Sequence, residues 1–199
     1  MFIVFEGIDS SGKRTQTELC TKYLKSKGRE VSVYNYPNRI GVYSTVIDNF
    51  LRKDIELTPT SQFLTFLSDI ANDNNKILRD RGKGMAVIAD RYIFSSIAYQ
   101  RIPIERAVNT IEALNFVRPD IVFFLDVSSE IAMSRKKRKI GSYTPRESKY
   151  EKHAERLLLA RIKYQTLAER NFLSNWVTIN GSESPDKVFE EIKKNLEKL

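Results

Sequence analysis

Residues 7–15 read Gly-Ile-Asp-Ser-Ser-Gly-Lys-Arg-Thr and directly follow the apolar run Phe2-Ile3-Val4-Phe5. The apolar run predicts a buried strand, and the residues from Lys13 onward have the pattern of a helix. Glycines at this spacing let consecutive backbone N–H groups and a helix N-terminus point at one spot, where a di- or triphosphate binds. The stretch therefore predicts a phosphate-binding strand–loop–helix unit, in which Lys13 supplies a positive charge for the outer phosphates.

This loop has the spacing of a P-loop, but two of its residues are unusual. The residue after the lysine is normally Ser or Thr, whose hydroxyl binds Mg²⁺, and here it is Arg14. Thr15 lies roughly 100° further around the helix axis, so it does not simply replace that hydroxyl. The carboxylate of Asp9 repels phosphate, so we expect it to bind a hydroxyl group or act through a metal ion. The alternative for Asp9 is a turn-forming residue without chemistry.

The size and composition of the chain favour one globular domain over residues 1–199. The chain has 199 residues, 41% of them hydrophobic and 29% charged, which suffices for one well-buried core. A single cysteine, Cys20, excludes an internal disulfide and fits a reducing compartment. A single histidine, His153, argues against zinc sites and histidine triads. No apolar run approaches membrane-spanning length and a strand begins at residue 2, so we expect no signal peptide, no membrane partner and a cytoplasmic location.

The net charge of +8 is concentrated in one part of the chain. Residues 130–163 hold eleven basic and four acidic side chains, a surplus of seven. Such a stretch can bind nucleic acid or a membrane surface, clamp a small polyanion, or form a solvated helix face.

Apolar runs and helical patterns alternate along the whole sequence. Strand-like runs occur at 2–6, 31–35, 85–89, 120–126 and 176–180. Helical patterns occur at 13–27, 41–53, 58–80, 93–100, 104–116, 129–139, 149–173 and 185–198. Thr58-Pro59 and Ser184-Pro185 have the pattern of helix N-caps. The alternation predicts an α/β fold with a five-stranded parallel sheet and helices on both faces.

Four segments in order carry a resemblance to one family. They are Phe5-Glu6-Gly7-Ile8-Asp9 with Gly12-Lys13, Tyr36-Pro37-Asn38-Arg39, Asp90-Arg91-Tyr92 with Ser95 and Ala98-Tyr99-Gln100, and Arg118-Pro119-Asp120 with Leu125-Asp126-Val127. The chain resembles the thymidylate kinase family of P-loop nucleoside monophosphate kinases over nearly its whole length. The resemblance implies a three-layer P-loop NTP hydrolase fold with a small lid at about residues 135–150.

For the phosphoryl donor, the resemblance implies ATP with Mg²⁺. The ATP site would comprise Gly7, Ile8, Asp9, Ser10, Ser11, Gly12, Lys13, Arg14, Thr15 and Arg135. Lys13, Arg91, Asp9 and a lid arginine would be catalytic, and Asp90 would hold Mg²⁺ through water. The candidates for the lid arginine are Arg135 and Arg138, with Arg146 in reserve. The alternative for Asp90-Arg91 is a structural ion pair.

For the acceptor, the resemblance implies dTMP bound by Asp9, Tyr36, Arg39, Phe66, Ile70, Arg91, Ser96 and Tyr99. Asp9 would accept a hydrogen bond from the 3′-hydroxyl, Arg39 would approach the 5′-phosphate and Phe66 would stack on thymine. Phe66 also lies on an apolar stripe with Phe63 and Leu67, which is the pattern of a core residue.

One position of the acceptor site departs from the family. Where the family has an arginine four residues after the stacking phenylalanine, on the same helix face, this chain has Ile70. A missing donor weakens recognition of a pyrimidine carbonyl and puts strict selectivity for thymine in doubt.

The sequence therefore predicts a homodimeric kinase that makes dTDP from dTMP and ATP and has no nucleic-acid partner. A kinase for another nucleoside monophosphate or a deoxynucleoside is the nearest alternative. A non-catalytic nucleotide- or nucleic-acid-binding protein is the alternative from another class.

Overall fold

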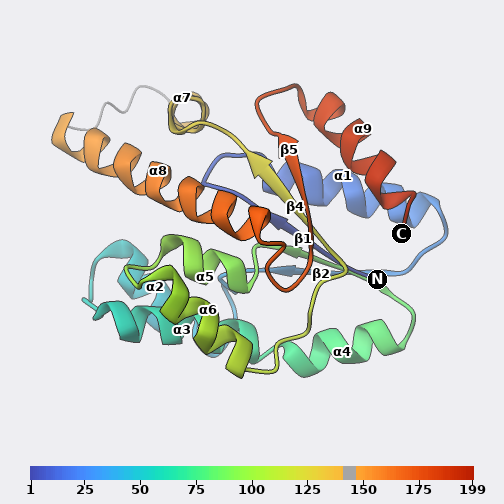
Figure 1. The fold of residues 1–199 in the computed structure, drawn as a ribbon, viewed down its shortest axis with the longest axis horizontal. Coiled ribbons are helices and arrows are strands. Elements are labelled where there is room, and N and C mark those ends of the chain that lie inside the picture. The colour runs from blue at the N-terminus through green and yellow to red at the C-terminus, as the bar shows by residue number, and fades with distance from the viewer. Residues whose placement is uncertain (141–146) are drawn as a thin grey trace.

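A five-stranded parallel sheet forms the centre of the molecule in the computed structural model (Figure 1). The structure describes residues 1–140 and 147–199, and the side chains of residues 1–137 and 152–199. The strands are β1 (Phe2–Glu6), β2 (Val31–Asn35), β3 (Ala86–Asp90), β4 (Ile121–Asp126) and β5 (Asn175–Asn180), in the order β2-β3-β1-β4-β5. Each of the five strands predicted from the sequence is confirmed, with ends that differ by at most one residue.

Helices cover both faces of this sheet, as predicted. They are α1 (Lys13–Ser26), α2 (Ser44–Arg52), α3 (Pro59–Ala71), α4 (Asn74–Gly82), α5 (Ile93–Tyr99), α6 (Ile104–Ala113), α7 (Ser129–Ile140), α8 (Glu147–Glu169) and α9 (Pro185–Leu196). Helices α1 and α9 pack on one face, and helices that include α3, α5 and α8 pack on the other (Figure 1). In the described part of the chain, no helix is both long and apolar enough to cross a bilayer.

The central strand β1 shows why the sheet needs both helical layers. Its residues Phe2 and Val4 belong to the core cluster on one face, and Ile3 and Phe5 belong to the cluster on the other. Successive side chains of a strand point to opposite faces, so an uninterrupted apolar run has to be covered twice.

The single helix predicted over 58–80 was wrong, because the segment forms α3 and α4 with a break at residues 72–73. Polar side chains next to the break bond to groups outside their own helix. The carboxylate of Asp73 accepts a hydrogen bond from Tyr36, and Asn74 bonds to the backbone of Asn115 and Val117. Short polar side chains of this kind compete with the helix for hydrogen bonds. The predicted N-caps Thr58 and Ser184 are both confirmed by hydrogen bonds to the first turn of α3 and α9.

Candidate active site

The loop between β1 and α1 requires glycine at both ends. Gly7 has φ +144°, and a Cβ there would lie 2.7 Å from the carbonyl oxygen of Leu125. Gly12, the N-cap of α1, has φ +107°. Residues with a side chain rarely adopt these φ values. Glycine at both positions therefore allows the loop to approach β4 closely and to enter the helix.

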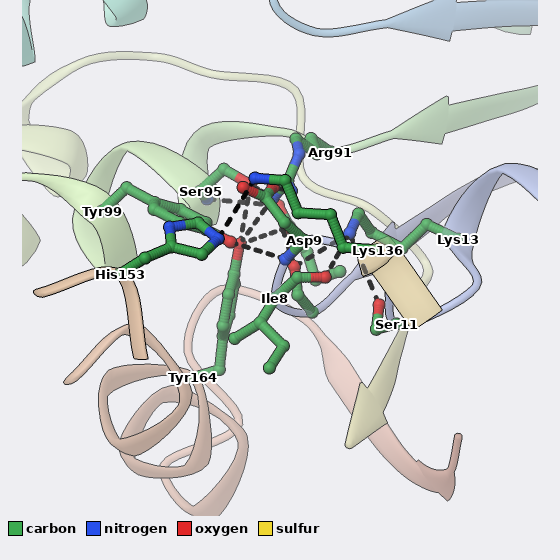
Figure 2. Close-up of polar contacts among 12 residues, drawn as sticks. Ile8, Asp9, Ser11, Lys13, Arg91, Ser95, Tyr99, Lys136, His153 and Tyr164 are labelled. Atoms are coloured by element: carbon green, nitrogen blue, oxygen red, sulfur yellow. Dashed lines mark hydrogen bonds and ion pairs between the residues drawn. The ribbon is translucent and has the colours of Figure 1, made fainter. Parts of the chain in front are cut away.

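The ammonium group of Lys13 is folded back over this loop (Figure 2). Its Nζ donates hydrogen bonds to the carbonyl oxygens of Gly7 (3.0 Å) and Ile8 (2.8 Å), and it lies 3.4 Å from Oγ of Ser11. Burial of the side chain, together with repulsion from Arg91, lowers the pKa of Lys13 to about 8. The group is therefore mostly charged at neutral pH and close to the range in which it loses its proton.

Arg91 follows β3 and is the centre of a dense polar cluster (Figure 2). Its Nη2 lies 2.5 Å from Oδ1 of Asp9, and its Nη1 donates to Gly7, Ser95 and Tyr164 at 3.1–3.3 Å. Burial opposes ionisation of Asp9, but the charges of Arg91 and Lys13 outweigh it and hold the pKa of Asp9 below its usual value. The predicted alternative of an Asp90–Arg91 ion pair does not occur, because the partner of Arg91 is Asp9.

Beneath Arg91 lies a fully buried carboxylate, Glu6. It accepts hydrogen bonds from the backbone N–H groups of Tyr92 and Ser95 and from the hydroxyls of Ser95 (2.7 Å) and Tyr164 (2.8 Å). Burial raises the pKa of Glu6, and Arg91 opposes that shift. The same two hydroxyls also contact Arg91, so Glu6 links strand β1, helix α5 and helix α8 around the guanidinium.

Two cavities open at the carboxyl ends of β1 and β3, where parallel sheets commonly bind ligands. The first cavity has a volume of 970 Å³, and the second, the P-loop cavity, has a volume of 1140 Å³. Both are lined by Asp9, Arg14, Asn35, Tyr36, Arg39, Asp90 and Arg91. These seven residues, here called the shared wall, bring the two spaces together at the Asp9–Arg91 pair.

Every residue predicted to bind the acceptor lines the first cavity. Phe66 is only half-buried and makes an edge contact with Phe50, whereas its stripe neighbours Phe63 and Leu67 belong to the core. The core interpretation of Phe66 is therefore not supported. Ser96 is buried in the cavity wall. Ile70 is both a core residue and a wall residue.

The residues predicted to bind ATP divide into two groups. Asp9, Ser10, Ser11, Gly12, Lys13, Arg14, Thr15 and Arg135 line the P-loop cavity, together with residues 181–185. Gly7 and Ile8 are not in its lining, and their carbonyl oxygens instead hold Lys13.

Comparison with known proteins identifies the family. The family model described as thymidylate kinase matches residues 5–192. The chain belongs to the thymidylate kinase family. It is 35% identical to a thymidylate kinase of Thermosipho africanus, covering 100% of this chain and 98% of that protein. It is 30% identical to one of Caenorhabditis elegans, covering 100% and 91%, and 29% identical to one of Plasmodium falciparum, covering 100% and 90%.

The expected lid of this thymidylate kinase family member is described only in part. The guanidinium of Arg135 donates to the carbonyl oxygens of Ser11, Gly181 and Ser182 and so links α7 to both sides of the P-loop cavity. The side chain of Arg138, Arg146 and most of the predicted lid at 135–150 lie outside the described residues.

The predicted metal ligand Asp90 lies in the shared wall, as Asp9 does. Within the described residues, no group of three or more His, Cys, Asp or Glu side chains could hold a metal ion alone. Mg²⁺ commonly binds through one or two carboxylates, water and substrate phosphates, and this wall offers that kind of site. Arg14 supplies no ligand, and its Nε lies 3.0 Å from the carboxylate of Glu18.

The sequence did not single out three further residues near the site. Arg156 lines the first cavity, and its Cζ lies 5.4 Å from the ring centre of Tyr99. Lys136 lies 3.2 Å from His153, close to Asp9 and Tyr99 (Figure 2). Tyr164 joins the Glu6 cluster from α8. Arg156 and Lys136 were visible only as part of the basic stretch, since nothing in the local sequence distinguishes them from solvated cations.

Proposed function

We propose that this protein transfers the γ-phosphoryl group of ATP to dTMP, which yields dTDP and ADP. The observation that carries the proposal is the shared wall, because two cavities that meet at one cluster of charged groups suit a reaction between two bound nucleotides. A protein that only binds or hydrolyses one nucleotide needs a single cavity. The relatives' name, thymidylate kinase, supports the same reaction.

The charges of the site suit phosphoryl transfer without a general base. The acceptor is an anionic phosphate oxygen, so no proton has to be removed from it, and catalysis consists mainly of positioning and charge neutralisation. Lys13 would leave the loop carbonyls to bind the donor phosphates. Arg91 would bridge donor and acceptor phosphates from the shared wall, and a lid arginine such as Arg138 would complete the neutralisation.

In the first cavity, we propose that Asp9 accepts a hydrogen bond from the 3′-hydroxyl of dTMP and that Phe66 stacks on thymine. Tyr99 would pack against the deoxyribose, and Ser96 would lie beside the base. Arg39 would approach the 5′-phosphate. Since Arg39 is exposed and pairs with Asp48, the phosphate would have to compete with that carboxylate.

We propose Mg²⁺ as the cofactor, held by Asp90 through water and by the nucleotide phosphates. When bound, the ion would neutralise phosphate charge that the protein's cations leave uncompensated. Asp9 would also orient Arg91 beside the ion, because its carboxylate pairs with the guanidinium of Arg91.

A cytoplasmic homodimer without a nucleic-acid partner remains our proposal for the assembled enzyme. Exposed apolar side chains at Val46 on α2 and Leu64 on α3 are available for contact between two copies. Several cations of the basic stretch have partners within the chain: Arg161 pairs with Asp126, and Lys163 donates to three carbonyl oxygens in and just after α5. Internal use of these cations favours a structural and nucleotide-binding role over binding of a polynucleotide.

A coupled assay of ADP release with dTMP, dUMP, dCMP and dGMP as acceptors tests the function. We expect the highest kcat/KM with dTMP. Equal rates with all four acceptors would contradict the proposal, and a preference for another monophosphate would support the alternative that Ile70 keeps open. No turnover, combined with salt-sensitive polynucleotide binding, would favour the non-catalytic alternative.

A further inference from the structure

Arg14 occupies the helix position from which a P-loop normally offers a metal-binding hydroxyl. It is the second residue of α1, directly after Lys13, and it lines both cavities. Its side chain is 82% exposed, so the guanidinium is open to a ligand. A permanently charged donor therefore lies at the junction of the two proposed nucleotide sites.

We propose that Arg14 binds nucleotide phosphate directly and so takes over part of the neutralisation that a protein-held metal ion otherwise provides. The proposal rests on the proposed function and extends it to the metal requirement of the same site. It has two consequences for binding. ATP binds appreciably without a divalent ion, and the ion in the complex is held less firmly than it would be with Ser or Thr at position 14.

Of the three arginines in the shared wall, Arg14 has the carboxylate partner that phosphate can displace most easily. Arg91 is largely buried and pairs with Asp9, and Arg39 pairs with Asp48. Arg14 pairs with Glu18 four residues away on the same helix, and both side chains are exposed. Exposed pairs of this kind contribute little to stability, so phosphate can displace Glu18 at small cost.

The charge of Arg14 is also the reason we expect the metal ion to bind less firmly than it would with Ser or Thr at position 14. A guanidinium repels a divalent cation placed at the same phosphates, whereas a hydroxyl at that position would donate a lone pair to it. The other oxygen donors for the ion would come from Asp90, the phosphates and water. Replacement of Arg14 by threonine should therefore move phosphate binding and metal binding in opposite directions.

The first test measures ATP binding by titration calorimetry in the presence of EDTA. We expect Arg14→Ala and Arg14→Thr each to weaken binding about tenfold, which is the usual loss for one charge-assisted hydrogen-bonded contact. Lys25→Ala removes an exposed charge from the same helix away from both cavities, and it should change the affinity less than twofold. Binding of ATP to both Arg14 variants with wild-type affinity would overturn the proposal.

The second test counts bound Mn²⁺ by electron paramagnetic resonance in the ATP complex. We expect Arg14→Thr to hold Mn²⁺ about tenfold more tightly than the wild type, and Arg14→Ala to fall between them. Equal Mn²⁺ affinity in the wild type and Arg14→Thr would overturn the proposal. Thermal melting of each variant checks the fold. Neither test contains dTMP, so a failure of the proposed acceptor specificity is seen only in the acceptor assay and is distinguishable from a failure here.

Discussion

Nη2 of Arg91 lies 2.5 Å from Oδ1 of Asp9, in the shared wall where the two cavities meet. The proposed roles direct these groups to different partners, Arg91 to phosphates and Asp9 to a sugar hydroxyl. In the structure the two groups neutralise each other, and the same guanidinium also contacts the carbonyl oxygen of Gly7. Bound nucleotides would therefore compete for both groups, and substitutions here should affect turnover more than folding.

Replacement of Arg91 by alanine should lower kcat by a factor of about 10² or more, since it removes a cation placed to stabilise transferring phosphate. Steady-state assays with saturating ATP and dTMP measure the effect. Arg101→Ala, an exposed arginine just beyond α5, is the matched control and should retain activity within twofold. A loss below tenfold for Arg91→Ala would remove Arg91 from the proposed catalytic residues.

Binding of ATP at alkaline pH should be accompanied by uptake of a proton at Lys13. Its pKa in the folded protein is about 8, lowered from 10.5, and bound phosphate favours the charged form. At about pH 9 the free enzyme has mostly lost this proton and must regain it, whereas at about pH 7 it is already charged. ATP affinity should accordingly fall as the pH rises above about 8.

Calorimetry in buffers of different ionisation enthalpy measures this uptake. Lys13→Met is the control, because it has no proton to gain. Uptake that is equal at both pH values, or that persists in Lys13→Met, would show that another group is responsible.

An arginine at position 70 should increase the selectivity for thymine. Ile70 lies in the wall of the first cavity near Phe66, one helical turn away, and an arginine there can donate to a pyrimidine carbonyl but not to an amino group. We expect the ratio of kcat/KM for dTMP over dCMP to rise about tenfold in Ile70→Arg. Ile70→Leu controls for the change in packing. An unchanged ratio would mean that other residues read this edge of the base.

Loss of the Tyr164 hydroxyl should destabilise the fold and reduce turnover moderately. This hydroxyl donates to Glu6, contacts Ser95 and accepts from Arg91. Tyr164→Phe leaves the buried carboxylate with one fewer donor, so the free energy of unfolding should fall by about 1–3 kcal/mol in urea titrations.

The control is Tyr43→Phe, whose hydroxyl has no hydrogen bond in the described part of the chain. Its stability should stay within about 0.5 kcal/mol of the wild type. Equal stability of the two variants would contradict a supporting role for Tyr164.

Local patterns in the sequence predicted much of the fold. Five apolar runs became five parallel strands, and Thr58 and Ser184 start helices as expected. The break between α3 and α4 was missed because Asp73 and Asn74 bond to residues from distant segments, such as Tyr36 and Val117. A helical pattern records propensity within one segment and contains no information about such partners.

In the candidate site, too, individual residues were predicted from the sequence, whereas contacts between distant segments were not. The residues proposed for each nucleotide were predicted by number, and the structure places all of them except Gly7 and Ile8 in the walls of two adjoining cavities. Glu6 appeared only as a letter in a motif, although its cluster with Ser95 and Tyr164 surrounds Arg91. Tyr164 lies 158 residues from Glu6 along the chain, and no local signal connects the two.

By itself, the sequence determined the phosphate-binding loop, since the spacing of Gly7, Gly12 and Lys13 behind an apolar run is a local pattern. It also showed that Arg14 and Ile70 differ from the residues usual at these positions in the family, because such a difference concerns the identity of one residue and no contact. Only the tertiary structure decided that Phe66 faces a cavity, that Asp9 pairs with Arg91, and that the two cavities share a wall. Those are contacts between segments far apart in the chain, and their geometry is set by the packing of helices on the sheet.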